Sequence, residues 1–149
     1  MKHKAQMYFW ITAALIIIVG GLLQLLSGNS TIDINVKDTH IVIATFHFSL
    51  FLAFLYFMLG VCYYTFYKFD FVLNRKLTKV HTVITVLGLP AYLLFTMYVK
   101  HKSEESLSEI TGNYQLYNKI LTGIFLTVVI VQFLLPLNIF IGLIKRKKA

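Results

Sequence analysis

Residues 40–67 read HIVIATFHFSLFLAFLYFMLGVCYYTFY, an almost unbroken apolar stretch. A helix needs about 20 apolar residues to cross the hydrocarbon core of a bilayer. The stretch therefore predicts a transmembrane helix over about residues 40–67. It also carries His47 into the membrane, where an ionisable side chain costs roughly 3 kcal/mol on insertion scales and usually has a partner or a function. His47 is the first candidate functional residue.

Three further apolar segments are long enough to span, at about residues 7–26, 80–99 and 116–144. The whole chain is 58% hydrophobic, with a mean hydropathy of +0.73. This composition predicts an all-α integral membrane protein in which residues 1–149 form a single four-helix transmembrane domain. The second and fourth segments exceed a straight crossing, so we expect them to tilt or to emerge from the membrane. The polar residues 100–115 are expected to form a loop, with a short surface helix as an alternative.

Most of the positive charges fall on one side of these four spans, with Lys37, Lys100, Lys102 and Lys119 on the other. Lysines and arginines lie before the first span, in residues 68–79 and in the tail 145–148, whereas most of the acidic residues lie on the other side. The positive-inside rule then predicts a multi-pass protein of the cell inner (cytoplasmic) membrane with both termini in the cytoplasm. The formal net charge of +8 is explained by topology, so we expect membrane lipid and no nucleic acid as a partner. A single cysteine, Cys62, excludes an internal disulfide.

The run Asp38-Thr39-His40-Ile41-Val42-Ile43-Ala44-Thr45-Phe46-His47 resembles the tenth helix of subunit I of the haem-copper oxidases. The usual run in that family is His-Asp-Thr-Tyr-Tyr-Val-Val-Ala-His-Phe-His. The positions that differ are Lys37 for the first histidine, His40 and Ile41 for the two tyrosines, and Thr45 for the penultimate histidine. The last histidine of the run is retained as His47.

The resemblance continues on both sides of this run, in the same order as in the family. Residues 9–34 look like the ninth helix and the loop after it, residues 73–81 like the entry to the eleventh helix, and residues 132–138 like the middle of the twelfth. The chain thus resembles only the last four helices of the family's subunit. Because the family's twelve helices form three similar groups of four, the resemblance implies a homo-oligomer, with a trimer favoured over a dimer.

For the site, the resemblance implies that His47 is the axial ligand of a low-spin haem, b-type in this chain. The position of the ligand to the oxygen-binding haem is Thr45, a lost ligand position. We therefore expect electron transport in a respiratory chain without oxygen reduction, no copper, and no cytochrome-c oxidase enzyme activity from this chain alone. Other respiratory-chain subunits are candidate partners.

A second axial ligand is harder to find. A helix rises 1.5 Å per residue, which places His47 roughly 10 Å below His40 and the outer surface. His81 begins the third helix from the other side, so the two histidines differ in depth by about 17 Å across a core of about 30 Å. Axial nitrogens lie only about 4 Å apart. This leaves a histidine from another copy, Met97, or a five-coordinate iron.

Two more positions follow from the same run. His40, two helical turns from His47 on one face, is a candidate contact for a haem propionate; an interfacial histidine facing headgroups is the alternative. The resemblance implies arginines for propionates after the eleventh helix, where this chain has Lys100-His101-Lys102. Asp38 matches a magnesium-binding position, but the neighbouring Lys37 opposes a cation, so we expect no magnesium and a helix cap instead.

Two other functions remain open on the sequence. The first is a cofactor-free structural or assembly subunit of a respiratory oxidase, and the second is a small copper-handling membrane protein using His40, His47 and Met58. Of the remaining polar residues in the spans, His81 is expected to pack or to form a hydrogen bond. Gln24, Gln132 and Asn138 are amides that can bond between helices, while Pro90 and Pro136 are expected to kink their helices.

Overall fold

A computed structural model describes residues 4–27, 31–36, 39–69, 72–105 and 107–146. Its elements, in chain order, are α1 (Lys4–Ser27), β1 (Thr31–Val36), β2 (Thr39–Ala44), α2 (Thr45–Lys68), α3 (Arg75–Glu105), α4 (Leu107–Gln132) and α5 (Leu134–Arg146). The chain divides into two compact units, Met1–Asp70 and Phe71–Ala149. Each is described by itself below, and a single four-helix domain stays a prediction.

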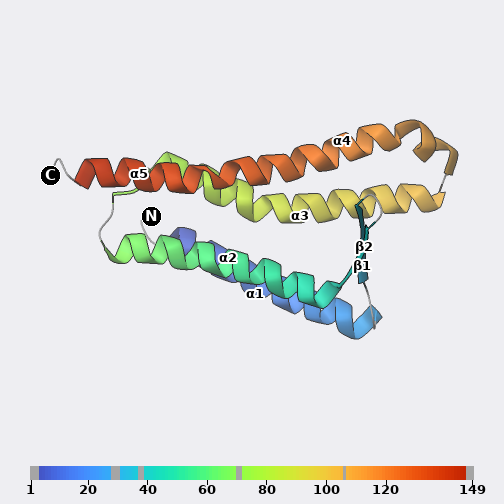
Figure 1. The fold of residues 1–149 in the computed structure, drawn as a ribbon, viewed down its shortest axis with the longest axis horizontal. Helices are drawn as coiled ribbons and strands as arrows, with labels where there is room; N and C mark the ends of the chain where they lie inside the picture. Colours follow the sequence, from blue (N-terminus) through green and yellow to red (C-terminus); the bar gives the residue numbers. More distant parts are fainter. Residues whose placement is uncertain (1–3, 28–30, 37–38, 70–71, 106, 147–149) are drawn as a thin grey trace. The chain divides into compact units, whose positions relative to one another are not determined.

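The first unit is a helical hairpin in which α1 and α2 run antiparallel, with the two short strands between them in sequence (Figure 1). Aromatic rings hold the two helices together at the end away from the strands. Phe9, which is fully buried, stacks on Tyr63 with ring centroids 5.6 Å apart and meets Tyr56 at 6.2 Å. Such aromatic pairs add about 0.5–1.5 kcal/mol beyond the area they bury.

Small residues let the helices of this hairpin approach closely. A Cβ at Gly60 would collide with the indole of Trp10, and a Cβ at Gly20 would collide with the side chain of Ser49. Helices in lipid pack mainly through such close contacts, because lipid is as apolar as the side chains and gives little hydrophobic drive. The glycines therefore determine how near α1 and α2 lie.

The second unit is also a hairpin, in which α3 runs antiparallel to α4 and α5 (Figure 1). The helix ladder is interrupted between α4 and α5, where the amide of Phe133 donates to the carbonyl of Ile130 at 3.1 Å. Pro136 explains the break, because it has no N–H to donate to the carbonyl of Gln132, four residues earlier, and its ring crowds that carbonyl. The predicted disturbance at Pro136 is confirmed, whereas α3 continues through Pro90.

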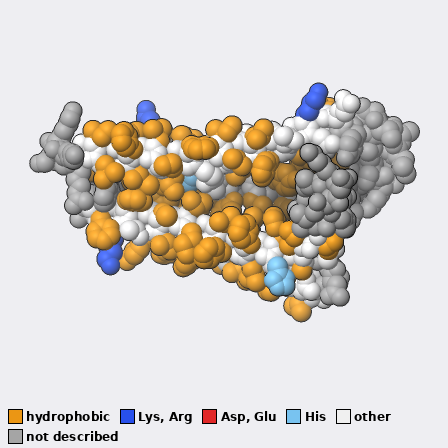
Figure 2. All heavy atoms as spheres, in the orientation of Figure 1, with side chains coloured by type: hydrophobic (Ala, Val, Ile, Leu, Met, Phe, Trp, Pro, Cys, Tyr) orange, Lys and Arg blue, Asp and Glu red, His pale blue; other side chains and the backbone are white. Residues whose placement is uncertain are grey.

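Four helices are long and apolar enough to cross a membrane, as the sequence predicts. They cover Ala5–Leu26, Thr45–Lys68, Arg75–Thr96 and Gln115–Ile144, the last formed by α4 and α5 together. The visible faces of both hairpins are covered mainly with hydrophobic side chains, and the lysines and arginines lie toward the helix ends (Figure 2). This distribution suits helices surrounded by lipid.

Two predicted boundaries are wrong. The second span begins at Thr45 rather than at residue 40, because residues 39–44 pair with residues 31–36 in an antiparallel ribbon whose register sets Ile32 opposite Ile43. Their β-branched composition favours a strand over a helix turn. Residues 100–115 are helical on both sides of residue 106, so helix replaces the predicted loop over more of this stretch than the short surface helix expected as the alternative. Lysine and glutamate are good helix formers and no proline interrupts this segment.

Candidate functional site

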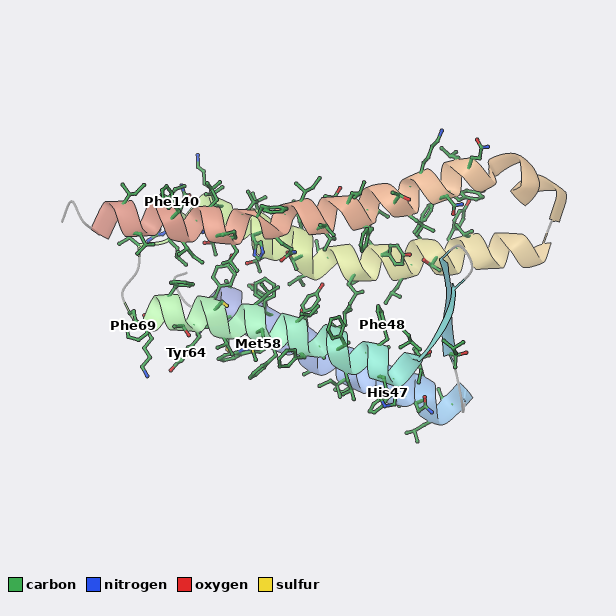
Figure 3. All side chains as sticks on the ribbon, viewed as in Figure 1. His47, Phe48, Met58, Tyr64, Phe69 and Phe140 are labelled. Atoms are coloured by element: carbon green, nitrogen blue, oxygen red, sulfur yellow. The ribbon has the colours of Figure 1, made fainter. Side chains whose placement is uncertain are left out.

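His47 is the third residue of α2 and lies in its first turn, with an exposed side chain (Figure 3). Its ring meets the neighbouring Phe46 edge-on, with centroids 6.3 Å apart. Within the described part of the chain it makes no hydrogen bond. The two helical turns predicted between His40 and His47 are wrong, because the helix starts at Thr45 and His47 lies only about 3 Å along its axis. The His47 imidazole is therefore accessible and lies near one end of the α2 span.

His40 is not on this helix. It belongs to β2, where its Cα partner is Asn35, so the predicted placement of His40 and His47 on one helix face is wrong. The side chain of His40 lies outside the described residues, and its contact with a propionate stays a prediction. Thr45, the lost ligand position, is half-buried, and its carbonyl accepts a hydrogen bond from the Ser49 hydroxyl at 2.9 Å.

A groove of about 560 Å³ lies between α1 and α2. Its lining residues are Trp10, Ala13, Ala14 and Ile17 from α1 and Leu50, Ala53, Phe54 and Phe57 from α2. Alanines provide little side-chain volume, so the space is open between larger aromatic and aliphatic groups. His47 precedes Leu50 by three residues and Phe54 by seven, and these spacings place all three on one side of the helix. The groove therefore extends along α2 from the turn that follows His47.

The sequence analysis missed this groove. The sequence contains the α2 side of the groove as a helical stripe, because Leu50, Phe54 and Phe57 follow His47 by three, seven and ten residues. The sequence could not predict which surface of α1 lies opposite this stripe. Only the register of the two helices places Ala13 and Ala14 opposite Ala53, and that register comes from contacts distant in sequence.

The second unit contains a buried polar cluster. The side chain of His81 is fully buried, and its Nε2 lies 3.2 Å from Oε1 of Gln132. The Gln132 amide nitrogen donates to the Thr85 hydroxyl at 3.1 Å and to the Val128 carbonyl at 2.9 Å. Because a carbonyl only accepts, the amide orientation is fixed and His81 must donate from Nε2. The predicted hydrogen bond of His81 and the predicted interhelical bond of Gln132 are both confirmed.

Asn138 joins α5 to the beginning of α3. Its Oδ1 accepts from the backbone N–H of Asn74 at 2.7 Å, and its Nδ2 donates to the Thr78 hydroxyl at 2.8 Å and to the Asn74 carbonyl at 3.4 Å. Asn74 in turn caps α3 by accepting from the N–H of Lys76 at 3.0 Å. The predicted interhelical role of Asn138 is confirmed, and this amide fixes the start of α3.

Replacing Asn138 by leucine is expected to destabilise the second hairpin by about 2 kcal/mol, because the part-buried N–H of Asn74 loses its acceptor. Thermal unfolding in mild detergent, followed by circular dichroism, measures the change. Asn118→Leu is the matched control, since Asn118 is exposed on α4. Equal melting temperatures for the two variants would show that the Asn138 bonds contribute nothing measurable.

The other predicted ligands are not brought together. His47 and Met58 are eleven residues apart on α2, about 16 Å along its axis, and Figure 3 shows them on separate turns. Among the described residues no group of three or more histidines, cysteines or acids is arranged to hold a metal ion. Lys37 and Asp38 lie outside the described residues, as do the side chains of Met97 and of residues 100–102.

One family model covers the part of the chain that contains the His47 run. The family model described as "Cytochrome C and Quinol oxidase polypeptide I" matches residues 1–101. The alternative cytochrome c oxidase subunit 1 of Bradyrhizobium diazoefficiens is 39% identical over 77 residues, which are 51% of this chain and 13% of that protein. No solved structure matches.

The match places His47, the groove and most of α3 inside the family region. The resemblance of residues 132–138 to the family lies beyond residue 101 and stays a prediction. The aligned part spans only about an eighth of the curated relative. With four helices able to span a bilayer, the protein is a multi-pass membrane protein, and the chain belongs to the cytochrome c and quinol oxidase polypeptide I family.

Proposed function

We propose that this protein binds a b-type haem in the membrane and moves electrons, with His47 as an axial ligand of the iron. The observation that carries the proposal is the accessible imidazole of His47, placed one turn before an apolar groove on the same side of α2. An imidazole nitrogen is an ordinary axial ligand for haem iron. An ionisable side chain exposed at the end of a membrane span also gains from having such a partner.

The groove suits a large flat apolar group. Its volume of about 560 Å³ falls within the range of about 300–1,000 Å³ typical of cofactor pockets. Ala13, Ala14 and Ala53 leave room for a ring system, and Trp10 and Phe54 provide aromatic walls. When bound, haem supplies a one-electron redox centre whose potential depends on burial and on hydrogen bonds around the ligand. The chain's own part is to present His47 and to keep water away from the groove.

Oxygen reduction is not part of the proposal. In the family's usual run, the residue two before the retained histidine is also a histidine, and here it is Thr45. A threonine hydroxyl offers no imidazole nitrogen, and the Thr45 carbonyl is occupied by Ser49. The proposal is therefore electron transfer without an oxygen-reducing centre, in the company of other respiratory-chain subunits.

The second axial ligand is proposed to come from another copy of the chain. His81, the other histidine whose side chain is described, is fully buried and bonded to Gln132, so it is not available to iron at His47. A histidine from a neighbouring copy then completes the coordination, and a trimer is the proposed assembly. We place this assembly in the cytoplasmic membrane with both termini inside, on the lysine and arginine distribution.

A cofactor-free structural subunit of a respiratory oxidase is the second candidate. One observation favours it: His47 is not among the residues that line the groove. In that case the two hairpins are scaffold only, held by the glycine contacts and by the buried amides.

The absorption spectrum of the purified protein distinguishes the two candidates. A haem protein is expected to show a sharp Soret band and split visible bands on reduction, and native mass measurement of the same sample gives the number of chains per haem. A colourless preparation, from cells that supply haem and load other cytochromes, contradicts the haem proposal and leaves the structural subunit. A monomeric mass contradicts the proposed trimer, and a coloured monomer would leave Met97 or a five-coordinate iron.

A further inference from the structure

The first two turns of α3 carry a group of exposed cations. Arg75, Lys76 and Lys79 are all exposed, and the first turn of the helix contains no acidic residue. None of the three makes an ion pair within the described residues. Three exposed positive charges at one end of a membrane span attract anionic lipid at the surface of the bilayer.

An apolar stripe leads away from these cations along the same side of α3. The stripe consists of Val80, Val83 and Leu87, which follow Lys76 by four, seven and eleven residues. Their exposed fractions are 45%, 44% and 59%. These spacings keep the side chains on one helical face. The stripe lies on the outer surface of its hairpin, because the buried His81 and Thr85 occupy the other side of α3.

The dimensions of this face match one lipid molecule. Leu87 lies about 16 Å along the helix from Lys76, at 1.5 Å per residue. One leaflet of a hydrocarbon core about 30 Å thick has a similar depth, about 15 Å. The cations thus lie at headgroup level when the stripe lies beside the acyl chains of the same leaflet.

We propose that this face of α3 is a binding site for an anionic phospholipid. Lys76 and Lys79 hold the phosphate, and Val80, Val83 and Leu87 contact an acyl chain. A zwitterionic headgroup is disfavoured because it brings a further positive charge toward three existing ones. The inference is independent of haem binding, since it involves only the second hairpin.

Native mass spectrometry of the full-length protein, released from an equimolar mixture of phosphatidylglycerol and phosphatidylcholine, tests the site. The wild type is expected to retain phosphatidylglycerol in excess. Each lysine near a membrane surface contributes about 1 kcal/mol to binding an anionic lipid, which is about fivefold in affinity. In the variant K76Q/K79Q the excess is therefore expected to fall at least about fivefold.

Lys119→Gln is the matched control, because Lys119 is an exposed lysine of α4 in the same hairpin but outside this face; it is expected to keep the excess. Leu87→Ser is expected to lower retention of phosphatidylglycerol without changing the charge. Excess inorganic phosphate is expected to leave the bound lipid in place. Equal lipid ratios in the wild type and K76Q/K79Q, the same loss in Lys119→Gln, or displacement by phosphate alone would each overturn the proposal.

Discussion

Gly60→Leu is expected to disrupt the pairing of α1 with α2. A side chain at this position meets the indole of Trp10 at once, and the backbone carbonyl of Gln6 is only 3.3 Å from where its Cβ would lie. Backbone and a ring held by neighbouring aromatics cannot move aside easily. We expect the free energy of unfolding to fall by about 3 kcal/mol, which is the upper end of the usual cost of overpacking.

The protein contains its own reporter for this change. Trp10 is the single tryptophan of the chain, and it packs near Phe57 and Tyr64, with centroids 6.4 and 5.9 Å away. Its fluorescence in detergent is expected to change in Gly60→Leu, together with a lower unfolding temperature. In Gly21→Leu both are expected to stay as in the wild type, because nothing lies within 4 Å of a Cβ at Gly21. Unchanged Trp10 emission in Gly60→Leu would contradict the close packing of this hairpin.

His47→Ala is expected to remove essentially all bound haem. The variant loses the proposed iron ligand, whereas the apolar groove is left intact and has no histidine among its lining residues. Haem content per chain, measured as the pyridine haemochrome of equal amounts of purified protein, reports the loss. The circular dichroism of the variant is expected to match that of the wild type, because the His47 side chain is exposed.

Thr45→Ala is the control for this experiment. Thr45 lies in the same helical turn as His47, but residues two positions apart on a helix point about 200° apart. The proposal gives Thr45 no ligand role. Haem content is expected to stay at the wild-type value. A loss of haem in Thr45→Ala as large as in His47→Ala would show that the first turn of α2 matters as structure rather than through His47.

The number of spans was predictable from the sequence because each depends only on local composition. Gln24 was predicted to bond between helices, but its buried Oε1 has no hydrogen-bond partner among the described residues. The contacts of His81, Gln132 and Asn138 were predictable in kind, since a polar group in a membrane span usually has a partner. Their actual partners were not, because the pairing of Asn138 with Asn74 joins residues far apart in the chain. Local composition cannot determine such a register.

The start of α2 shows where the sequence interpretation failed. The run from His40 to Ala44 is apolar enough for a span, and hydropathy alone does not separate a strand from a helix. Residues 39–44 form a strand because they pair with residues 31–36. As a result α2 begins at Thr45, and His47 lies in its first turn instead of two turns from the helix start. The predicted spacing of two helical turns between His40 and His47 does not hold, because α2 begins at Thr45. A position of His47 nearer to this end of the span increases its expected difference in depth from His81, which begins the third helix from the other side.

The most direct test of the account is the spectrum of His47→Gly with and without added imidazole. If the His47 imidazole binds the iron, the variant purifies without a b-type spectrum, and free imidazole together with haem restores the sharp reduced bands. A His47→Gly protein that keeps the wild-type spectrum with no imidazole present would contradict the central claim, because the iron would then be held by another residue.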